Sequence, residues 1–252
     1  ITMNTTMNTT MNTTMTRKSP IIISVEGNIG AGKTTILDNL QQSMINHKQI
    51  LFLREPVDIW ETIIDKDTGD NILQSFYKNP TKYAFTFQVM AYSTRLSYIR
   101  DAINKHPDCA VIICERSLSA DKNIFAQMLY DDGKIDDLQF QVYCKFYKEY
   151  ACEFGLDGII YIDASASKCH QRIIKRSRTG ESTIELEYLE SCKRYHDKWL
   201  INNKEDTILR IDTSSDVSYE KKDDSDQGIQ WLCQIEKFIY STLSTYMDKP
   251  AK

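Results

Sequence analysis

The fold is decided by the stretch Gly27-Asn28-Ile29-Gly30-Ala31-Gly32-Lys33-Thr34-Thr35, which satisfies the pattern G-x-x-x-x-G-K-[ST]. An apolar run at residues 21–25 precedes it and predicts a buried parallel strand, and a helix-like pattern begins near Lys33. Glycines in such a loop let successive backbone N–H groups point at phosphate oxygens, the lysine adds a positive charge, and the Thr34 hydroxyl can ligate Mg²⁺. Because strand, loop and helix occur in this order, a nucleoside triphosphate site is favoured over a chance glycine-rich turn.

Composition limits the class of protein. The 252 residues carry a net charge of -4 and suit one sizeable domain, which we expect over residues 19–252. The acidic balance argues against a nucleic-acid-binding surface, and no apolar run is long enough to span a bilayer. Seven cysteines are scattered without disulfide or zinc spacing. We therefore expect a cytoplasmic protein with reduced thiols and with neither nucleic acid nor membrane as a partner.

The first 18 residues form a separate segment. The tetrad Met3-Asn4-Thr5-Thr6 recurs from Met7 and again from Met11, and it offers almost no apolar surface to offset the entropy of ordering. The segment also lacks the apolar core of a secretory signal. We expect residues 1–18 to be a disordered low-complexity tail outside the functional domain.

Five short apolar runs are separated by segments with helical patterns. The runs cover residues 21–25, 50–53, 110–114, 158–162 and 207–211, and the longer helices are expected over residues 81–104, 136–153, 184–202 and 227–246. Such alternation predicts an α/β, three-layer fold of the P-loop NTPase type, with a five-stranded parallel sheet flanked by helices. In such sheets ligands bind outside the carboxyl ends of the strands, so the residues that follow each strand are the informative ones.

Charged residues follow two of the predicted strands. Glu55 comes after the run at residues 50–53, where Pro56 ends the strand, and Glu115 and Arg116 follow the run at residues 110–114. A P-loop protein usually carries an Asp at the position of Glu115, where it holds the metal. Each acidic residue alone is equally compatible with an exposed strand end. Beside a phosphate-binding loop they indicate phosphoryl transfer, with a carboxylate to accept a hydroxyl proton and an arginine near the moving phosphate.

A third cluster of charge lies at residues 172–181. Arg172 and Arg176 are four residues apart and so share one helix face, while Arg178 comes where Gly180 indicates that the helix ends. Taken alone, the segment is compatible with a basic, solvated helix. Beside a phosphate-binding loop, we expect a lid over about residues 172–184 that closes over the triphosphate and excludes water.

Several strings resemble the deoxynucleoside kinase family, in that family's order and spacing. They are GNIGAGKTT, REPVDIW, FTFQ with Arg95 seven residues later, ERS followed by Asp121, and KRSRTGES. The resemblance covers the chain from about residue 20 to its end and is strongest to the deoxycytidine and deoxyguanosine kinase branch. It implies ATP-dependent phosphorylation of the 5′-hydroxyl of a deoxynucleoside in nucleotide salvage, with Mg²⁺. It also implies a homodimer packed through helices at residues 81–104 and 121–150.

The resemblance assigns roles to the charged residues. Glu55 matches the carboxylate that takes the proton of the 5′-hydroxyl, and Arg116 matches the arginine that contacts that hydroxyl. Glu115 matches the acidic residue beside Mg²⁺, which is an alternative proton acceptor. We favour Glu55, because a carboxylate on the metal side is the weaker base.

The remaining implied roles concern the two nucleosides. Tyr77 and Glu181 match the family residues that recognise the sugar of the acceptor, and Gln88 matches the one that reads its base. The aromatic residues around that base are matched by Trp60, Phe87 and Phe125. Arg176 and Arg178 match the arginines on the donor phosphates. The residues at the donor base are matched by Arg172 and, in a more variable segment, by Ser215, Asp216 and Val217.

Arg95 and Asp121 bear on the choice of base. They occupy positions where the cytidine and purine branch has an Arg–Asp pair and the thymidine-accepting branch has apolar residues. A guanidinium held by a carboxylate would crowd the 5-methyl group of thymine and offer donors to cytosine or a purine. We therefore expect deoxycytidine, deoxyadenosine or deoxyguanosine to be preferred over thymidine. The alternative is that the two residues form a surface ion pair.

Two other functions are open to the sequence. A nucleoside monophosphate kinase would share the fold, but it needs extra cations near the second strand, where this chain has Glu55 and Trp60. A structural subunit derived from a kinase would keep the fold without activity. Such relatives tend to lose residues like Lys33, Glu55, Arg116 or Arg176, all of which are present here.

Overall fold

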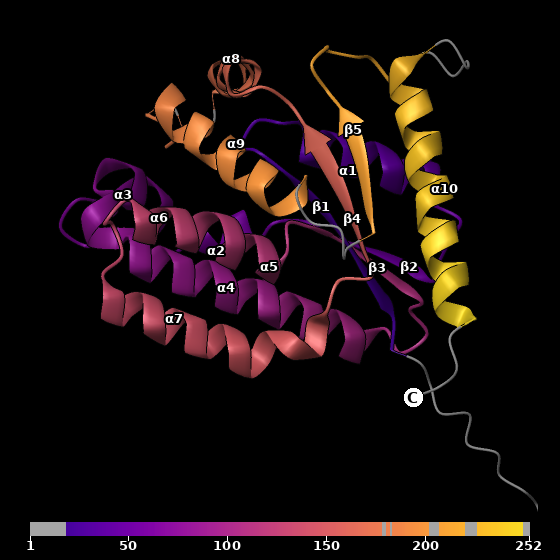
Figure 1. Cartoon of the computed structure of the whole chain (residues 1–252), viewed down its shortest axis with the longest axis horizontal. Coiled ribbons are helices and arrows are strands. Elements are labelled where there is room, and N and C mark those ends of the chain that lie inside the picture. The colour runs from indigo at the N-terminus through magenta and orange to yellow at the C-terminus, as the bar shows by residue number, and fades with distance from the viewer. Residues whose placement is uncertain (1–18, 178–179, 182, 202–206, 220–225, 249–252) are drawn as a thin grey trace, which may run out of the picture.

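The computed structural model describes residues 19–177, 180–181, 183–201, 207–219 and 226–248. Residues 1–18, expected to be a tail, and Arg178, expected on the lid, lie outside these described ranges. Within them the chain forms a three-layer α/β fold, in which one sheet lies between two layers of helices (Figure 1). The predicted fold class is confirmed.

The strands of the sheet are all parallel and lie in the order β2-β3-β1-β4-β5. Their bounds are β1 Ile21–Gly27, β2 Ile50–Leu53, β3 Val111–Glu115, β4 Gly158–Asp163 and β5 Ile208–Asp212. Each predicted apolar run forms one of these strands, with ends shifted by at most about two residues, an ordinary boundary error. β1 lies at the centre and is buried along its whole length, which is why its sequence is apolar without alternation.

Helices connect the strands. The α-helices are α1 Lys33–Ser43, α2 Val57–Glu61, α3 Ile72–Lys78, α4 Pro80–Lys105, α5 Leu118–Ala120, α6 Gln127–Asp131, α7 Asp137–Tyr150, α8 Ala166–Arg176, α9 Leu186–Leu200 and α10 Gln227–Met247. A π-helical turn, η1, spans Asp121–Ala126, and a 3₁₀ turn, η2, spans Ala151–Phe154. The four long predicted helices correspond to α4, α7, α9 and α10. α3 and α7 both begin with capping boxes, at Asn71 and Asp136, that satisfy their first backbone N–H groups.

Residues 121–150, where the resemblance implies helices that pack in a dimer, form three separate helical elements. The segment is divided into η1, α6 and α7, and residues 132–136 form a turn between α6 and α7. Gly133 has a φ of 67°, a left-handed conformation that ends α6 because glycine adopts it without steric cost. Asp136 then caps α7, so the helical pattern resumes in a separate element.

The two faces of the sheet are covered by different helices. Alternate β1 residues Ile21, Ile23 and Val25 pack with α1 and α10, whereas Ile22 packs with Ile99 of α4. Figure 1 shows α10 on one side of the sheet and α4 with α7 on the other. All strands end at one edge of the sheet, where the phosphate-binding loop, the residues after β2 and β3, and α8 come together.

Candidate active site

The phosphate-binding loop joins the central strand to α1. Its three glycines, Gly27, Gly30 and Gly32, have φ values of 150°, 79° and 104°, a region that L side chains rarely adopt. Lys33 folds back over the loop, and its Nζ donates to the carbonyl oxygens of Gly27 at 3.2 Å and Asn28 at 3.0 Å. Burial and the nearby arginine charge lower the pKa of Lys33 to about 8, although nearby carboxylates oppose this.

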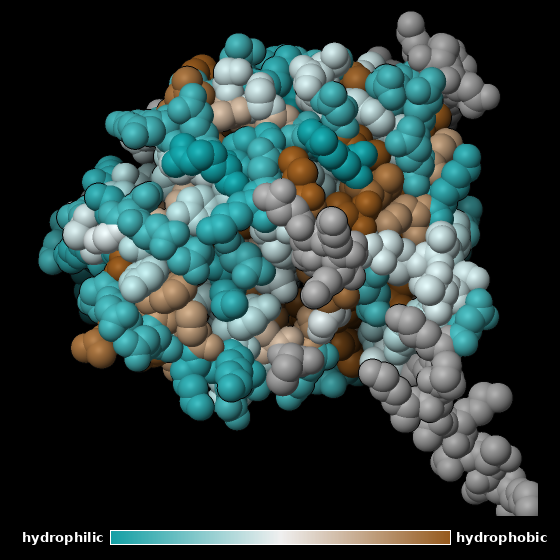
Figure 2. All heavy atoms as spheres, viewed as in Figure 1, coloured by the Kyte–Doolittle hydropathy of each residue, from teal (hydrophilic) through white to brown (hydrophobic). Residues whose placement is uncertain are grey.

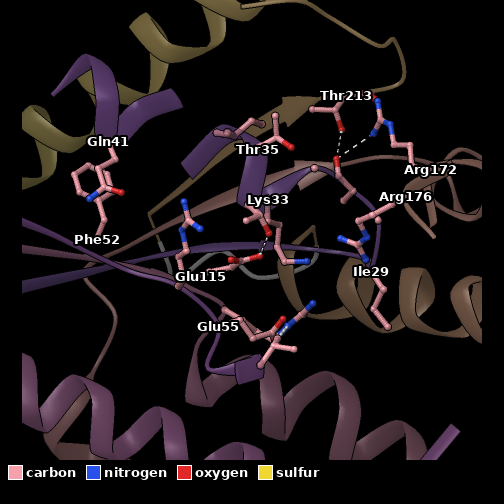
Figure 3. Close-up of a pocket in the computed structure, with 18 of the residues that line it drawn as sticks. Ile29, Lys33, Thr35, Gln41, Phe52, Glu55, Glu115, Arg172, Arg176 and Thr213 are labelled. Carbon is pink, nitrogen blue, oxygen red and sulfur yellow. Dashed lines mark hydrogen bonds and ion pairs between the residues drawn. The ribbon is translucent and has the colours of Figure 1, made fainter. Parts of the chain in front are cut away.

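A large cavity of about 880 Å³ opens at the carboxyl edge of the sheet. Most residues predicted to hold the phosphate donor line it: residues 29–35 of the loop, Arg172 and Arg176 of α8, and residues 215–217. Figure 3 shows Lys33, Glu55 and Glu115 near its centre, with Arg172 and Thr213 at one end. Gly27 and Asn28 do not line it. Asn28 instead donates from Nδ2 to the Leu189 carbonyl at 2.8 Å, which ties the loop to α9.

Thr34 and Glu115 meet inside this large cavity. The Thr34 hydroxyl donates to Glu115 Oε1 at 2.7 Å, which joins the start of α1 to the end of β3. A hydroxyl and a carboxylate are hard oxygen donors of the kind that Mg²⁺ prefers, and Mg²⁺ needs only one or two such ligands beside water and phosphate. The chemistry of the two side chains therefore fits a magnesium ion.

Glu55 lies between two arginines. Its Oε1 accepts from Arg95 NH2 at 2.6 Å and from Arg116 Nε at 3.3 Å. Burial alone would raise the pKa of Glu55, but the charges of Arg95, Arg116 and Lys33 outweigh it and lower the pKa to about 2. Glu55 is therefore ionised at neutral pH and has a fixed orientation.

Arg116 reaches Glu55 from a strained backbone position. Its φ of 66° is left-handed, which is uncommon for a residue other than glycine. The Arg116 N–H donates to the Val25 carbonyl at 3.0 Å, and NH2 donates to the Gly27 carbonyl at 3.3 Å. The guanidinium lies 4.5 Å from the centre of the Phe125 ring. The strained turn thus directs the side chain back across β1 to the site.

Arg95 and Asp121 form a buried ion pair. Arg95 Nε donates to both carboxylate oxygens of Asp121, at 3.1 and 2.9 Å, and the two side chains are 5% and 2% exposed. The expectation of a pair is therefore correct, and the alternative of a surface ion pair is wrong. Burial raises the pKa of Asp121 to about 6 against the opposing effect of Arg95. Sequence did not predict that the same guanidinium also contacts Glu55.

A smaller cavity adjoins the large one. Every residue predicted to bind the acceptor lines it: Glu55, Trp60, Tyr77, Phe87, Gln88, Arg95, Arg116, Asp121, Phe125 and Glu181. Trp60 and Phe87 meet edge to face, with ring centres 5.3 Å apart. Gln88 Oε1 is buried and has no hydrogen-bond partner among the described residues, so it is available to a ligand.

Sequence reasoning missed two aromatic residues of the smaller cavity. Phe76 stacks on Phe87 with ring centres 4.8 Å apart, and Tyr188 meets Tyr77 edge to face. Both lie in helices with ordinary amphipathic patterns, in α3 and α9. No local signal separates an aromatic residue that lines a cavity from one that packs in a core.

The predicted lid lies against both cavities. Arg176, near the end of α8, forms an ion pair with Glu181, which lines the large and the small cavity. Arg172 makes four contacts, to a carboxylate oxygen of Asp216 at 2.9 Å and to the carbonyls of Ala31, Thr213 and Ser215. These bonds tie α8 to the phosphate-binding loop and to residues 213–216, so Arg172 holds two walls of the large cavity together.

Comparison with known proteins agrees with this geometry. A family model described as deoxynucleoside kinase matches residues 23–238. The chain belongs to the deoxynucleoside kinase family. It is 37% identical to a probable deoxycytidine kinase of fowlpox virus, over 86% of this chain and 87% of the relative. It is 32% identical to deoxycytidine kinase of Homo sapiens, over 77% of this chain and 84% of the relative. Mitochondrial deoxyguanosine kinase of Xenopus laevis is also 32% identical, over 71% and 72% of the two chains.

Family membership confirms the main functional prediction. The chain is an enzyme, a kinase that phosphorylates a deoxynucleoside with ATP as the phosphate donor in nucleotide salvage. Neither the monophosphate kinase nor the structural subunit is favoured by these matches. Among the residues that the structure describes, no helix is both long and apolar enough to cross a membrane.

Gly30 offers a direct test of how this deoxynucleoside kinase holds its donor. In Gly30→Ala the new Cβ would lie 2.6 Å from the Cys169 carbonyl oxygen and 2.9 Å from a carbon of Ile173, so the loop must move away from α8. We expect the KM for ATP to rise about tenfold or more, because the loop N–H groups lose their alignment, while the KM for the deoxynucleoside changes little.

Gly69→Ala is the matched control for this test. Gly69 has a similar φ of 75°, but a Cβ there meets nothing within 4 Å. This variant carries the backbone strain without the steric clash, so its KM for ATP should remain that of the wild type. Equal KM values in the two alanine variants would contradict the role of the Gly30 contact.

Proposed function

We propose that the enzyme phosphorylates deoxycytidine, deoxyadenosine or deoxyguanosine in preference to thymidine. The buried Arg95–Asp121 pair in the wall of the smaller cavity carries this proposal. A guanidinium fixed by a carboxylate leaves no apolar space for the 5-methyl group of thymine and presents donors to the other bases. The names of the relatives, deoxycytidine and deoxyguanosine kinases, support the same preference.

In the proposed reaction, the 5′-oxygen of the nucleoside attacks the γ-phosphorus of ATP. The bond from the γ-phosphorus to the bridging oxygen breaks, and ADP leaves. Glu55 accepts the proton that the 5′-hydroxyl loses as its oxygen bonds to phosphorus. Its low pKa keeps Glu55 ionised before the reaction but makes it a weak base. Proton transfer to it therefore becomes favourable only as the 5′-oxygen bonds to phosphorus and its hydroxyl becomes strongly acidic. Arg116, which contacts Glu55, stabilises the negative charge that develops on the transferred group.

Glu115 is assigned to the metal side of the site. Its carboxylate already accepts the Thr34 hydroxyl at 2.7 Å, whereas Glu55 faces the smaller cavity as well as the large one. We propose that Thr34 and Glu115 hold Mg²⁺, directly or through water. When bound, the ion neutralises charge on the phosphate oxygens.

The donor is proposed to lie along the large cavity. The loop over residues 27–35, of which residues 29–35 line the cavity, is proposed to surround its phosphates, and Arg176 to contact their oxygens. Arg172 with Ser215, Asp216 and Val217 borders its base. Arg178, which lies outside the described residues, is proposed to contact the same phosphate oxygens because the family resemblance implies it. The acceptor is proposed to fill the smaller cavity. There Gln88 reads the base edge, Trp60, Phe87 and Phe125 enclose the base, and Tyr77 with Glu181 contacts the sugar.

The proposed preference is tested by initial rates of ATP-dependent phosphorylation with deoxycytidine, deoxyadenosine, deoxyguanosine and thymidine side by side. High rates with the first three and a low rate with thymidine are expected. A preference for thymidine would overturn the account of base choice while leaving the kinase activity intact. Deoxycytidine monophosphate serves as the control acceptor and should not be phosphorylated.

We also propose a homodimer in the cytoplasm. Four apolar residues of α7, each four positions after the last, are exposed: Leu138 at 74%, Val142 at 46%, Phe146 at 43% and Tyr150 at 41%. This spacing puts them on one helix face, and Figure 2 shows apolar side chains at the surface over α7. A row of exposed apolar residues on one helix face supports a protein interface. The cysteines whose side chains the structure describes are all free thiols, which supports a reducing compartment.

Phe146→Glu is expected to weaken the proposed dimer about a hundredfold, because a charge would be buried within an apolar interface. Light scattering coupled to gel filtration, run over a concentration series, measures the change. Ile45→Glu is the matched control, since Ile45 is apolar and 65% exposed but follows α1 on the other side of the sheet. A wild-type monomer at micromolar concentration, or two variants of equal mass, would contradict the proposed interface.

A further inference from the structure

Glu26 is a buried acid for which the reaction above has no use. It is the residue of β1 just before Gly27, it is 0% exposed, and neither carboxylate oxygen has a partner with hydrogen-bond geometry among the described residues. Burying a carboxylate without partners is costly, and natural proteins seldom do so without a reason. Its position one residue before the phosphate-binding loop indicates that the reason concerns the active site.

Two other polar groups beside Glu26 are also buried and have no hydrogen-bond partner among the residues that the structure describes. They are the Ser24 hydroxyl, two residues earlier on the same face of β1, and NH1 of Arg116. Ser117 lies close as well: its hydroxyl accepts from the Ala120 N–H at 3.1 Å, which leaves its own hydrogen to donate. Burial raises the pKa of Glu26, while the Arg116 charge and the hydroxyls of Ser117 and Ser24 oppose that rise. Arg116 is bound to the backbone on either side of Glu26, through its N–H to the Val25 carbonyl at 3.0 Å and through NH2 to the Gly27 carbonyl at 3.3 Å, so these groups lie together where β1 and β3 end.

Arg116 is the member of this group that also reaches the reacting atoms. Its guanidinium is held at Nε by Glu55, at NH2 by the Gly27 carbonyl and on one face by the Phe125 ring. NH1 is the nitrogen without a hydrogen-bond partner in the described part of the chain. Because its backbone is strained, the side chain needs contacts on more than one side to keep its orientation. A buried site with several polar groups is one that an ordered water molecule occupies favourably.

We infer that Glu26 is a positioning residue, which holds Arg116 toward Glu55 from beneath the phosphate-binding loop through a water molecule shared with Ser24 and Ser117. The inference rests on the proposed role of Arg116 and extends it. Glu26 itself does not contact either substrate. Its carboxylate orients the guanidinium before the reaction, so that little reorganisation is needed as charge develops.

A double-mutant cycle on the full-length enzyme tests this role. Glu26→Gln keeps the size of the side chain and removes its charge, and we expect kcat to fall about ten- to a hundredfold with the KM for ATP changed less than about threefold. In an Arg116→Ala background, the same replacement should lower kcat no further, because the group through which Glu26 acts is absent. Additive effects of the two replacements would overturn the inference, as would an unchanged kcat in Glu26→Gln.

Two further variants separate positioning from folding. Glu26→Asp keeps the carboxylate and should recover part of the lost kcat, whereas a purely steric role predicts a greater loss than in Glu26→Gln. Tyr161→Phe is the control, because Tyr161 pairs with Glu26 across β1 and β4 and its hydroxyl donates to Asp197 at 3.0 Å, away from the substrates. It should lower the thermal unfolding midpoint without changing kcat. The base preference of the wild-type enzyme is measured in a separate experiment. A wrong prediction of base preference can therefore be distinguished from a wrong role for Glu26.

Discussion

Replacing Glu55 by glutamine is expected to lower kcat about a hundred- to ten-thousandfold, the usual contribution of a positioned general base. The replacement removes the proton acceptor and leaves an amide of the same shape. It also removes the negative charge that Arg95 and Arg116 share, at 2.6 and 3.3 Å. Because Lys33 and the loop are untouched, the dissociation constant for ATP should change much less than kcat. Single-turnover rates and ATP binding by calorimetry measure the two effects separately.

Two further variants test whether the loss of kcat is specific to Glu55. Glu61→Gln, an exposed residue at the end of the short helix α2 that follows Glu55 and Pro56, should have wild-type kcat. Glu115→Gln should chiefly raise the Mg²⁺ concentration needed for half-maximal rate, since Glu115 meets Thr34. An undiminished kcat in Glu55→Gln would show that another group accepts the proton. A loss in Glu115→Gln that no Mg²⁺ concentration relieves would point to Glu115 as that group.

Combining Arg95→Met with Asp121→Ala is expected to raise the kcat/KM of thymidine relative to that of deoxycytidine about a hundredfold. The double replacement opens apolar space for the 5-methyl group and removes donors that favour the other bases. The structure adds a consequence, because Arg95 also holds Glu55. Absolute kcat should therefore fall about tenfold for every substrate, while the pKa of Glu55 rises from its value of about 2.

The measurement that decides this prediction is the ratio of kcat/KM for thymidine to kcat/KM for deoxycytidine, rather than the rate with either substrate alone. A matched control is Lys105→Met with Asp101→Ala, which removes an exposed ion pair of 2.9 Å from the same helix α4. That variant should keep the wild-type ratio, because exposed pairs contribute little to structure. An unchanged ratio in the Arg95 and Asp121 double variant would refute the proposed basis of base choice.

The local sequence was sufficient to predict the elements that carry the chemistry. The strand, loop and helix around Lys33 were predicted because each has a strong pattern of its own: a continuous apolar run, spaced glycines and a helical period. Glu55 and Glu115 were predicted because parallel strands bring their carboxyl ends to one edge. The family resemblance supplied the acceptor residues, all of which line the smaller cavity.

What the sequence did not predict depends on contacts between distant residues. That Arg95 contacts Glu55 as well as Asp121 follows from how α4 crosses the ends of β2 and β3, which no local pattern records. Glu26 lies just beyond the predicted strand over residues 21–25 and was given no role, since a single acidic residue beside an apolar run gives no sign of its partners. The helix predicted from residue 136 corresponds to α7, whereas η1 and α6 were not predicted as separate elements.

Because Arg95 forms ion pairs with both Asp121 and Glu55, the order in which these residues can be replaced during evolution is also constrained. If Asp121 is replaced first, Arg95 keeps Glu55 and the Glu115 carbonyl as partners, so the cation remains compensated. If Arg95 is replaced first, Asp121 is left almost fully buried without its cation, and removing one partner of a buried pair costs about 3–5 kcal/mol. Lineages that gained thymidine use from such an ancestor would therefore have lost the aspartate before the arginine.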